Sequence, residues 1–119
     1  MNPTGPKILL HLEGLMVLIA ACAFYRELGA SWGNFALLLL VPDVSMLGYA
    51  LGKKVGAGVY NSAHTYPAPL LLWCLGYFGH YPAFLPLSAI WVAHIGLDRL
   101  LGYGLKYGTD FKDTHLNRV

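Results

Sequence analysis

Residues 8–28 read ILLHLEGLMVLIAACAFYREL, an apolar stretch that only His11 and Glu13 interrupt near its start. A spanning helix needs about 20 mainly apolar residues, because the hydrocarbon layer is about 30 Å thick and each helical residue rises about 1.5 Å. Three further stretches of this kind follow at residues 33–51, 59–78 and 84–104. The sequence therefore predicts four transmembrane helices.

Composition agrees with this interpretation. Of the 119 residues, 56% are hydrophobic and only 12% are charged, and the mean hydropathy is +0.51. These values are typical of an integral membrane protein and exclude an ordinary soluble domain. Short joints with Gly, Pro or Lys separate the four stretches, as tight helix connections require. We therefore expect one all-α domain over residues 1–119, an integral membrane four-helix up-down-up-down bundle with a cytoplasmic tail at 105–119.

The basic residues predict an orientation. Loops rich in Lys and Arg stay in the cytoplasm, and Arg26 alone falls at the opposite end of the predicted helices. We expect both termini to be cytoplasmic, in a bacterial inner membrane. Anionic headgroups explain the net charge of +2, so the expected partners are membrane lipids and not nucleic acid. The residues on the cytoplasmic side are Lys7, Lys53, Lys54, Lys106, Lys112 and Arg118.

Ionisable side chains inside the apolar stretches indicate where the chemistry lies. A charged group at the bilayer centre costs about 2.5–3.5 kcal/mol on insertion scales, so such residues usually have a partner or a function. By helical rise, three of these residues lie about 8–9 Å below the cytoplasmic face and two lie about 12–15 Å below it. All four helices thus place them in one half of the bilayer. We predict that one polar cavity, open to the cytoplasm, is lined by Glu13, Asp43, His64, His94 and Asp98.

Spacing and prolines support a shared cavity. His94 and Asp98 are four residues apart and share one face of a helix. Pro42 and Pro67 stand close to the polar residues of the second and third stretches, where each removes a backbone hydrogen bond. Broken turns at membrane depth are tolerated where they border protein or a wet cavity.

Imidazole and carboxylate groups suggest two kinds of chemistry. They suit a divalent metal, namely zinc, iron or manganese. Without a metal cofactor, a carboxyl group with a raised pKa and a histidine can act as general acid and base. The predicted metal ligands are His64, His94 and Asp98, and the predicted catalytic groups are Asp43, His94 and Glu13. Asn61, Arg99 and Tyr103 are predicted to orient them.

The leading hypothesis is a membrane-embedded enzyme acting on an amphipathic or lipid substrate. The alternatives are a metal-ion or proton carrier, a structural or partner-binding subunit, and haem ligation by the two histidines. A buried pair of Asp43 and His94 could also serve only to fix helix register. Gly48, Gly52 and Gly56 favour close helix packing, either within one chain or in a homodimer. The tail either covers the cytoplasmic mouth, bringing Asp113 or His115 to the site, or lies on the membrane surface.

Four blocks of sequence resemble a known family. They are PDVSMLGY at 42–49, YNSAHTY at 60–66, AHIGLDR at 93–99 followed by GYGLKY at 102–107, and FKDTHL at 111–116. Together they are similar to small four-helix bacterial membrane proteins classified as a domain of unknown function. The resemblance covers nearly the whole chain and implies no activity. It does imply that the tail belongs to the domain.

Overall fold

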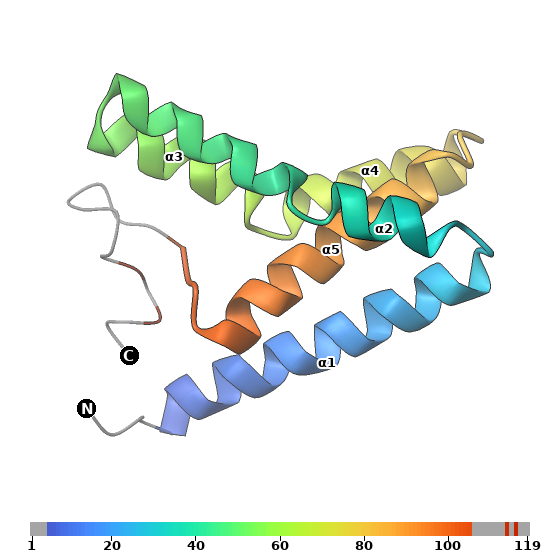
Figure 1. Cartoon of the computed structure of the whole chain (residues 1–119), viewed down its shortest axis with the longest axis horizontal. Helices are drawn as coiled ribbons and strands as arrows, with labels where there is room; N and C mark the ends of the chain where they lie inside the picture. Colours follow the sequence, from blue (N-terminus) through green and yellow to red (C-terminus); the bar gives the residue numbers. More distant parts are fainter. Residues whose placement is uncertain (1–4, 106–113, 115, 117–119) are drawn as a thin grey trace.

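The fold is taken from a computed structural model, which describes residues 5–105, 114 and 116. The elements are α1 Gly5–Glu27, α2 Trp32–Leu38, the 3₁₀ helix η1 Val41–Leu51, α3 Lys53–Ala63, α4 Pro67–Phe78 and α5 Phe84–Leu101. They form four limbs, namely α1, α2 with η1, α3 with α4, and α5, and successive limbs alternate in direction (Figure 1). α1 starts and α5 finishes at the same end of the molecule, at the left of the figure. The predicted all-α, up-down-up-down architecture is therefore confirmed.

The third limb departs from the expected single helix at 59–78. α3 already begins at Lys53 and ends at Ala63, and α4 begins at Pro67. Gly52 alone makes the preceding turn, with a φ of 114° that suits glycine. Among the described residues, the segments long and apolar enough to cross a membrane are therefore three: Gly5–Glu27, Trp32–Leu51 and Phe84–Leu101.

Polar and apolar side chains are distributed as expected for a membrane protein. Large apolar residues such as Leu37, Leu47 and Leu51 are exposed on the outside. His64, His94 and other polar residues are buried. In water this distribution would be unfavourable, because exposed apolar surface costs free energy. Lipid tails remove that cost, so the surface indicates a membrane protein.

α1 and α5 cross closely at two glycines. A Cβ added to Gly14 would lie 2.6 Å from the Leu100 nitrogen and 2.7 Å from the Gly96 oxygen. A Cβ added to Gly96 would lie 2.8 Å from the Leu18 nitrogen. Small residues at such crossings let two backbones approach. The two helices can therefore approach this closely because Gly14 and Gly96 carry no side chain.

The second limb is interrupted between α2 and η1, and Pro42 is the second residue of η1. The Asp43 N–H bonds the Leu40 carbonyl at 3.0 Å, three residues back instead of four, so it does not satisfy Leu39. Proline itself has no N–H to offer. This break leaves the Leu39 carbonyl free to accept a hydrogen bond from another part of the chain.

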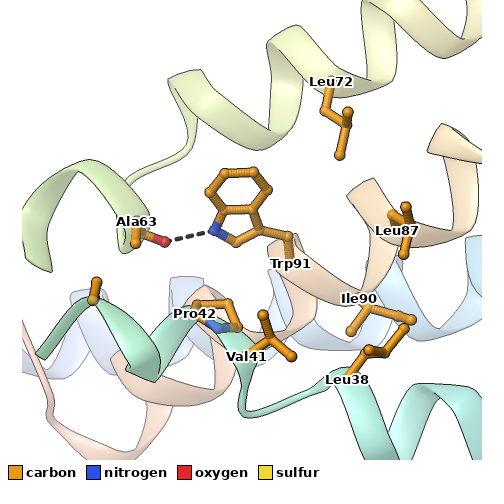
Figure 2. Close-up of a pocket in the computed structure, with 9 residues that line it drawn as sticks. Leu38, Val41, Pro42, Ala63, Leu72, Leu87, Ile90 and Trp91 are labelled. Carbon is orange, nitrogen blue, oxygen red and sulfur yellow. Dashed lines mark hydrogen bonds between the residues drawn. The ribbon is translucent and has the colours of Figure 1, made fainter. Parts of the chain in front are cut away.

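Pro67 interrupts the third limb in the same way. It offers no N–H to the Ala63 carbonyl, and α5 supplies the missing donor. The Trp91 indole Nε1–H donates to the Ala63 oxygen at 2.6 Å (Figure 2). The Arg99 Nη2–H likewise donates to the His64 oxygen at 2.8 Å. Side chains of α5 thus hold the broken third limb in place.

We expect Gly14→Ala to destabilise the protein by about 1–3 kcal/mol, because the new methyl group meets α5 backbone atoms that cannot easily move. Gly58→Ala is the matched control, since a Cβ there meets nothing within 4 Å. It should be neutral or stabilise α3 by up to about 1 kcal/mol. Thermal unfolding in detergent measures both. Equal melting temperatures for the two variants would contradict the close crossing.

Trp91→Phe should destabilise the fold by about 1–3 kcal/mol, because it leaves the Ala63 carbonyl without a donor. Pro67→Ala restores a backbone N–H at the position that faces this carbonyl in a continuous helix. In the Pro67→Ala background, Trp91→Phe should therefore cost less, with a coupling of at least about 0.5 kcal/mol. Unfolding of the two single variants and the double variant measures the coupling. Strictly additive effects would show that the indole bond does not compensate for the proline.

Candidate metal centre

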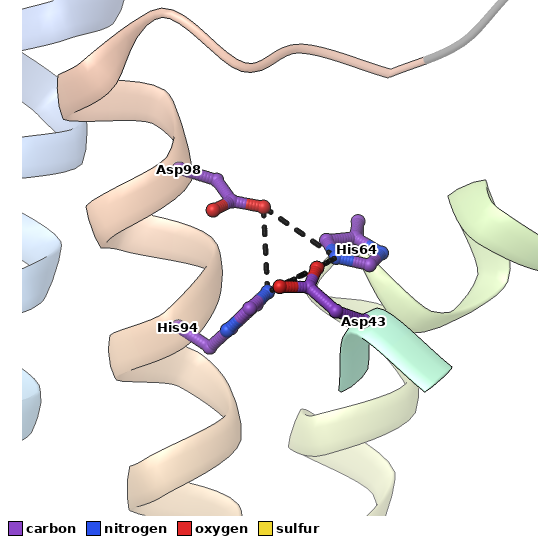
Figure 3. A group of neighbouring side chains, drawn as sticks. All are labelled: Asp43, His64, His94 and Asp98. Atoms are coloured by element: carbon purple, nitrogen blue, oxygen red, sulfur yellow. Dashed lines mark hydrogen bonds and ion pairs between the residues drawn. The ribbon is translucent and has the colours of Figure 1, made fainter. Parts of the chain in front are cut away.

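Four side chains from three parts of the chain meet inside the bundle (Figure 3). Asp43 comes from η1, His64 follows the last residue of α3, and His94 and Asp98 stand one turn apart on α5. One donor atom from each lies within 4.8 Å of all the others. Residues far apart in sequence thus form one compact group, which could hold a metal ion.

The distances within this group suit a small divalent cation. The two Nε2 atoms of His64 and His94 are 3.0 Å apart. Asp43 Oδ1 lies 2.9 Å from His64 Nε2 and 3.2 Å from His94 Nε2, and Asp98 Oδ2 lies 3.4 Å from each. Zinc binds its tetrahedral nitrogen and oxygen ligands at about 2.0–2.1 Å, which separates those ligands from one another by about 3.3 Å. The five distances lie around that value.

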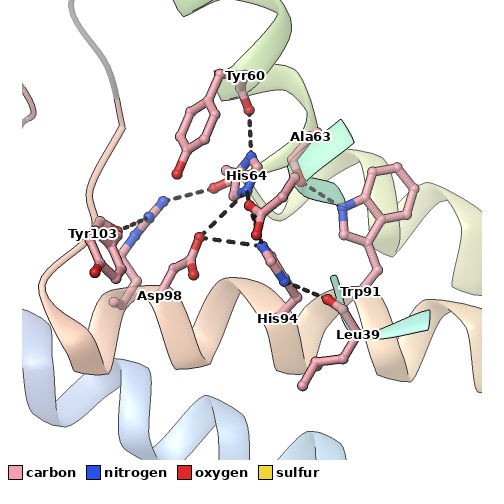
Figure 4. A network of polar contacts seen from close by, with 10 residues as sticks. Leu39, Tyr60, Ala63, His64, Trp91, His94, Asp98 and Tyr103 are labelled. Atoms are coloured by element: carbon pink, nitrogen blue, oxygen red, sulfur yellow. Dashed lines mark hydrogen bonds and ion pairs between the residues drawn. The ribbon is translucent and has the colours of Figure 1, made fainter. Parts of the chain in front are cut away.

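The outer nitrogens of both histidines are held by backbone carbonyls (Figure 4). His64 Nδ1 lies 2.8 Å from the Tyr60 oxygen, and His94 Nδ1 lies 2.5 Å from the Leu39 oxygen. A carbonyl can only accept, so each Nδ1 must carry the hydrogen. In the neutral rings each Nε2 then presents a lone pair to the centre of the group. This is how metal-binding histidines are commonly oriented.

Further contacts fix the position of His64. The Tyr60 ring stacks on the His64 ring, with centroids 3.8 Å apart and planes 7° apart. Arg99 donates to the His64 carbonyl at 2.8 Å and to the Tyr103 carbonyl at 3.1 Å. His64 is therefore fixed at both its ring and its backbone.

The group is closed on most sides and open at Asp43. The side chains of His64, His94 and Asp98 are 0%, 2% and 12% exposed, whereas that of Asp43 is 32% exposed. A molecule approaching from outside would therefore meet Asp43 first.

The structure brings together the three predicted metal ligands and Asp43, but it corrects the prediction for Glu13. Glu13 is exposed on α1, where it borders a groove with Leu9 and Tyr66. Its neighbour Gly14 faces α5, and consecutive helical residues point about 100° apart. Glu13 therefore cannot face the same way, and the expected single cavity lined by all five residues is wrong.

The three residues predicted to orient the site contribute in different ways. Arg99 contacts His64 through its side chain, whereas Tyr103 contributes its carbonyl and leaves its ring exposed. Asn61 accepts the His64 backbone N–H at 3.2 Å through its own carbonyl. The predicted tail residues Asp113 and His115 lie outside the described residues.

Sequence reasoning missed the contacts of Tyr60 and Leu39 with the histidines and the bond of Trp91 to Ala63. The bonds to the histidines come from backbone carbonyls, which any residue carries, so they gave no signal. Pro42 and Pro67 were the available signal, because each proline leaves a carbonyl nearby that needs another donor.

Comparison with known proteins gives a family but no activity. No curated protein and no solved structure is significantly similar to this chain. A family's sequence model does match, over residues 7–119, so the predicted resemblance to a family of unknown function is confirmed. The chain belongs to the family described as Domain of unknown function (DUF4260).

Proposed function

We propose that the protein is a membrane-embedded enzyme that uses a divalent metal, bound by Asp43, His64, His94 and Asp98, to act on an amphipathic substrate. One observation carries the proposal. Four lone-pair atoms converge within the bundle while both Nδ1 atoms are committed to carbonyls. Such a group needs a positive charge at its centre.

A metal ion satisfies this group better than a proton does. One proton can bridge only one pair of atoms, whereas a cation attracts all four. The two carboxylates also supply two negative charges, which a divalent ion neutralises in a region of low dielectric. Nitrogen and oxygen donors suit zinc, iron or manganese, and near-tetrahedral spacing favours zinc.

The uneven burial of the four ligands supports catalysis over a purely structural role. Structural zinc sites have four protein ligands, whereas catalytic sites have three and leave the fourth position to water or substrate. Here three ligands are enclosed and Asp43 is partly exposed, so Asp43 is the ligand that a substrate would displace. The metal would act as a Lewis acid on a carbonyl or phosphoryl oxygen. Once a substrate takes the place of Asp43 on the metal, the freed Asp43 carboxylate would accept the proton of an attacking water molecule.

The surroundings favour an enzyme over an ion carrier. A carrier needs a polar path through the membrane. Within the described residues, the space beyond Trp91 is lined by apolar side chains apart from Ser45. Hydrocarbon can enter such a space more easily than an ion, which supports an amphipathic substrate.

The orientation is also a proposal. The start of α1, the turn at Gly52 and the finish of α5 share one end of the molecule (Figure 1). Lys53 and Lys54 begin α3 directly after that turn, so the shared end carries positive charge. We therefore propose that the protein lies in a bacterial inner membrane with both termini in the cytoplasm.

Purified protein in detergent should bind about one equivalent of zinc, because a group of four correctly spaced ligands binds this ion tightly. His64→Gln and His94→Gln should each abolish binding, since a neutral amide replaces an imidazole ligand. His11→Gln is the matched control. His11 bonds the Leu100 carbonyl at 2.8 Å and lies outside the group, so this variant should retain zinc. Elemental analysis after dialysis gives the metal content.

Thermal unfolding with and without a chelator tests the same proposal independently. Bound metal stabilises the native state by mass action, so chelation should lower the melting temperature of the wild type and of His11→Gln only. The metal site would be overturned if the wild-type protein bound no zinc, iron or manganese and its melting temperature did not change on addition of the chelator.

Reporter fusions test the orientation. Fused after Val119, a reporter that works only in the cytoplasm should be active, and a reporter that works only in the periplasm should be inactive. Inserted at residues 29–31, the periplasmic reporter should be active and the cytoplasmic reporter inactive, because basic residues concentrate at the other end. Equal behaviour of the two fusions would contradict the four-limb topology across the membrane.

A further inference from the structure

An apolar cavity of about 390 Å³ lies between η1, α4 and α5. Figure 2 shows Leu72, Leu87, Ile90 and Leu38 around it, with the Trp91 ring beside Ala63 and above Pro42. Ligand pockets usually measure about 300–1,000 Å³ and are mostly apolar. A cavity of about 150 Å³ with apolar walls can already bind benzene. The space therefore suits a longer hydrocarbon segment.

This cavity adjoins the metal centre through shared elements. Pro42 and Ala63 line it, and each immediately precedes a ligand residue. Trp91 also lines it and stands three residues before His94 on α5. Figure 4 shows the Trp91 ring beside His94, on the side away from Asp98. The cavity therefore meets the polar group in the region of Trp91, Pro42 and Ala63.

One polar atom in the cavity wall lacks a partner. Ser45 lines the cavity, and its Oγ is buried with no hydrogen-bond partner among the described residues. Buried hydroxyl groups are normally hydrogen-bonded, because an unmade bond is costly. A ligand with a polar group near this point would supply the missing bond.

We propose that this cavity binds the hydrocarbon chain of the substrate while the polar end of the same molecule reaches the metal, with Ser45 bonding a polar atom between them. The inference rests on the proposed metal-dependent function and adds the substrate class, a single-chain amphiphile. A second apolar cavity of about 530 Å³ between α1, α4 and α5 shares no lining residue with the first. The described residues that line this second cavity do not include both a residue next to a metal ligand and a buried hydroxyl without a partner. We therefore assign the hydrocarbon chain of the substrate to the first cavity.

The experiment compares two hydroxamates, which chelate metals through the same head group and differ in chain length. Zinc-loaded protein in lipid nanodiscs is titrated with acetohydroxamate and with decanoyl hydroxamate, with empty nanodiscs correcting for partition into lipid. Wild type should bind the decanoyl compound at least about tenfold more tightly, since burial of two methylene groups already gives that factor.

Ser45→Leu should remove this preference, because the larger side chain fills the cavity. Zinc content and acetohydroxamate binding are measured on the same preparation. Ser62→Leu is the matched control. Ser62 is exposed and donates to the Gly58 carbonyl at 2.8 Å, away from the cavity, so the preference should persist. Leu72→Phe provides a second way to fill the space.

The outcomes separate the two proposals. Zinc and acetohydroxamate binding without a chain-length preference, or a preference that survives both cavity-filling variants, would overturn the chain site and leave the metal site intact. This result would also be expected if the cavity merely held a bulk lipid chain. Wild-type protein that takes up no metal would overturn both proposals.

Discussion

Two missing backbone N–H groups, at Pro42 and Pro67, impose the constraint on which the centre of this molecule depends. In hydrocarbon no water can satisfy a free carbonyl, so another protein group must do so. The Leu39 carbonyl accepts from His94, the Ala63 carbonyl from Trp91, and the His64 carbonyl from Arg99. All three donors lie on α5, which is a continuous helix. The broken second and third limbs are therefore positioned by the helix that also carries half of the candidate ligands.

This shared use of hydrogen bonds explains why the site is organised before any ligand binds. A histidine ring whose Nδ1–H is held by a carbonyl has a fixed tautomer and a fixed direction. Both rings are held in this way, and Tyr60 stacking further restricts His64. The repulsion between the converging lone pairs is then balanced by contacts that also hold the fold together. Such a group could hold a cation with little reorganisation, and our proposal of a catalytic site requires this of its ligands.

Much of this structure could be predicted from local sequence features, and the exceptions have physical reasons. Apolar length gave the helical limbs, and four-residue spacing placed His94 and Asp98 on one face. Glu13 was misplaced because depth in the membrane does not determine the direction of a side chain, and the close crossing at Gly14 turns it away from α5. The third span was expected to be continuous because Pro67 was expected to remove one backbone hydrogen bond without ending the helix. The carbonyl partners of the histidines could not be identified, since backbone groups leave no mark in the composition.

The apolar cavity and the polar group also follow from the same two breaks. Pro42 and Ala63, which flank the breaks, line the cavity, while the next residue in each case is a candidate ligand. Trp91 donates to the carbonyl at one of the breaks and also lines the cavity. An apolar wall so close to the candidate ligands keeps water away and lowers the local dielectric, which would strengthen the attraction between the cation and the substrate oxygen that we propose. A continuous helix in either limb would satisfy its own carbonyls and leave neither the ligands nor the cavity where they are, so the chemistry that we propose requires the defects in the helices.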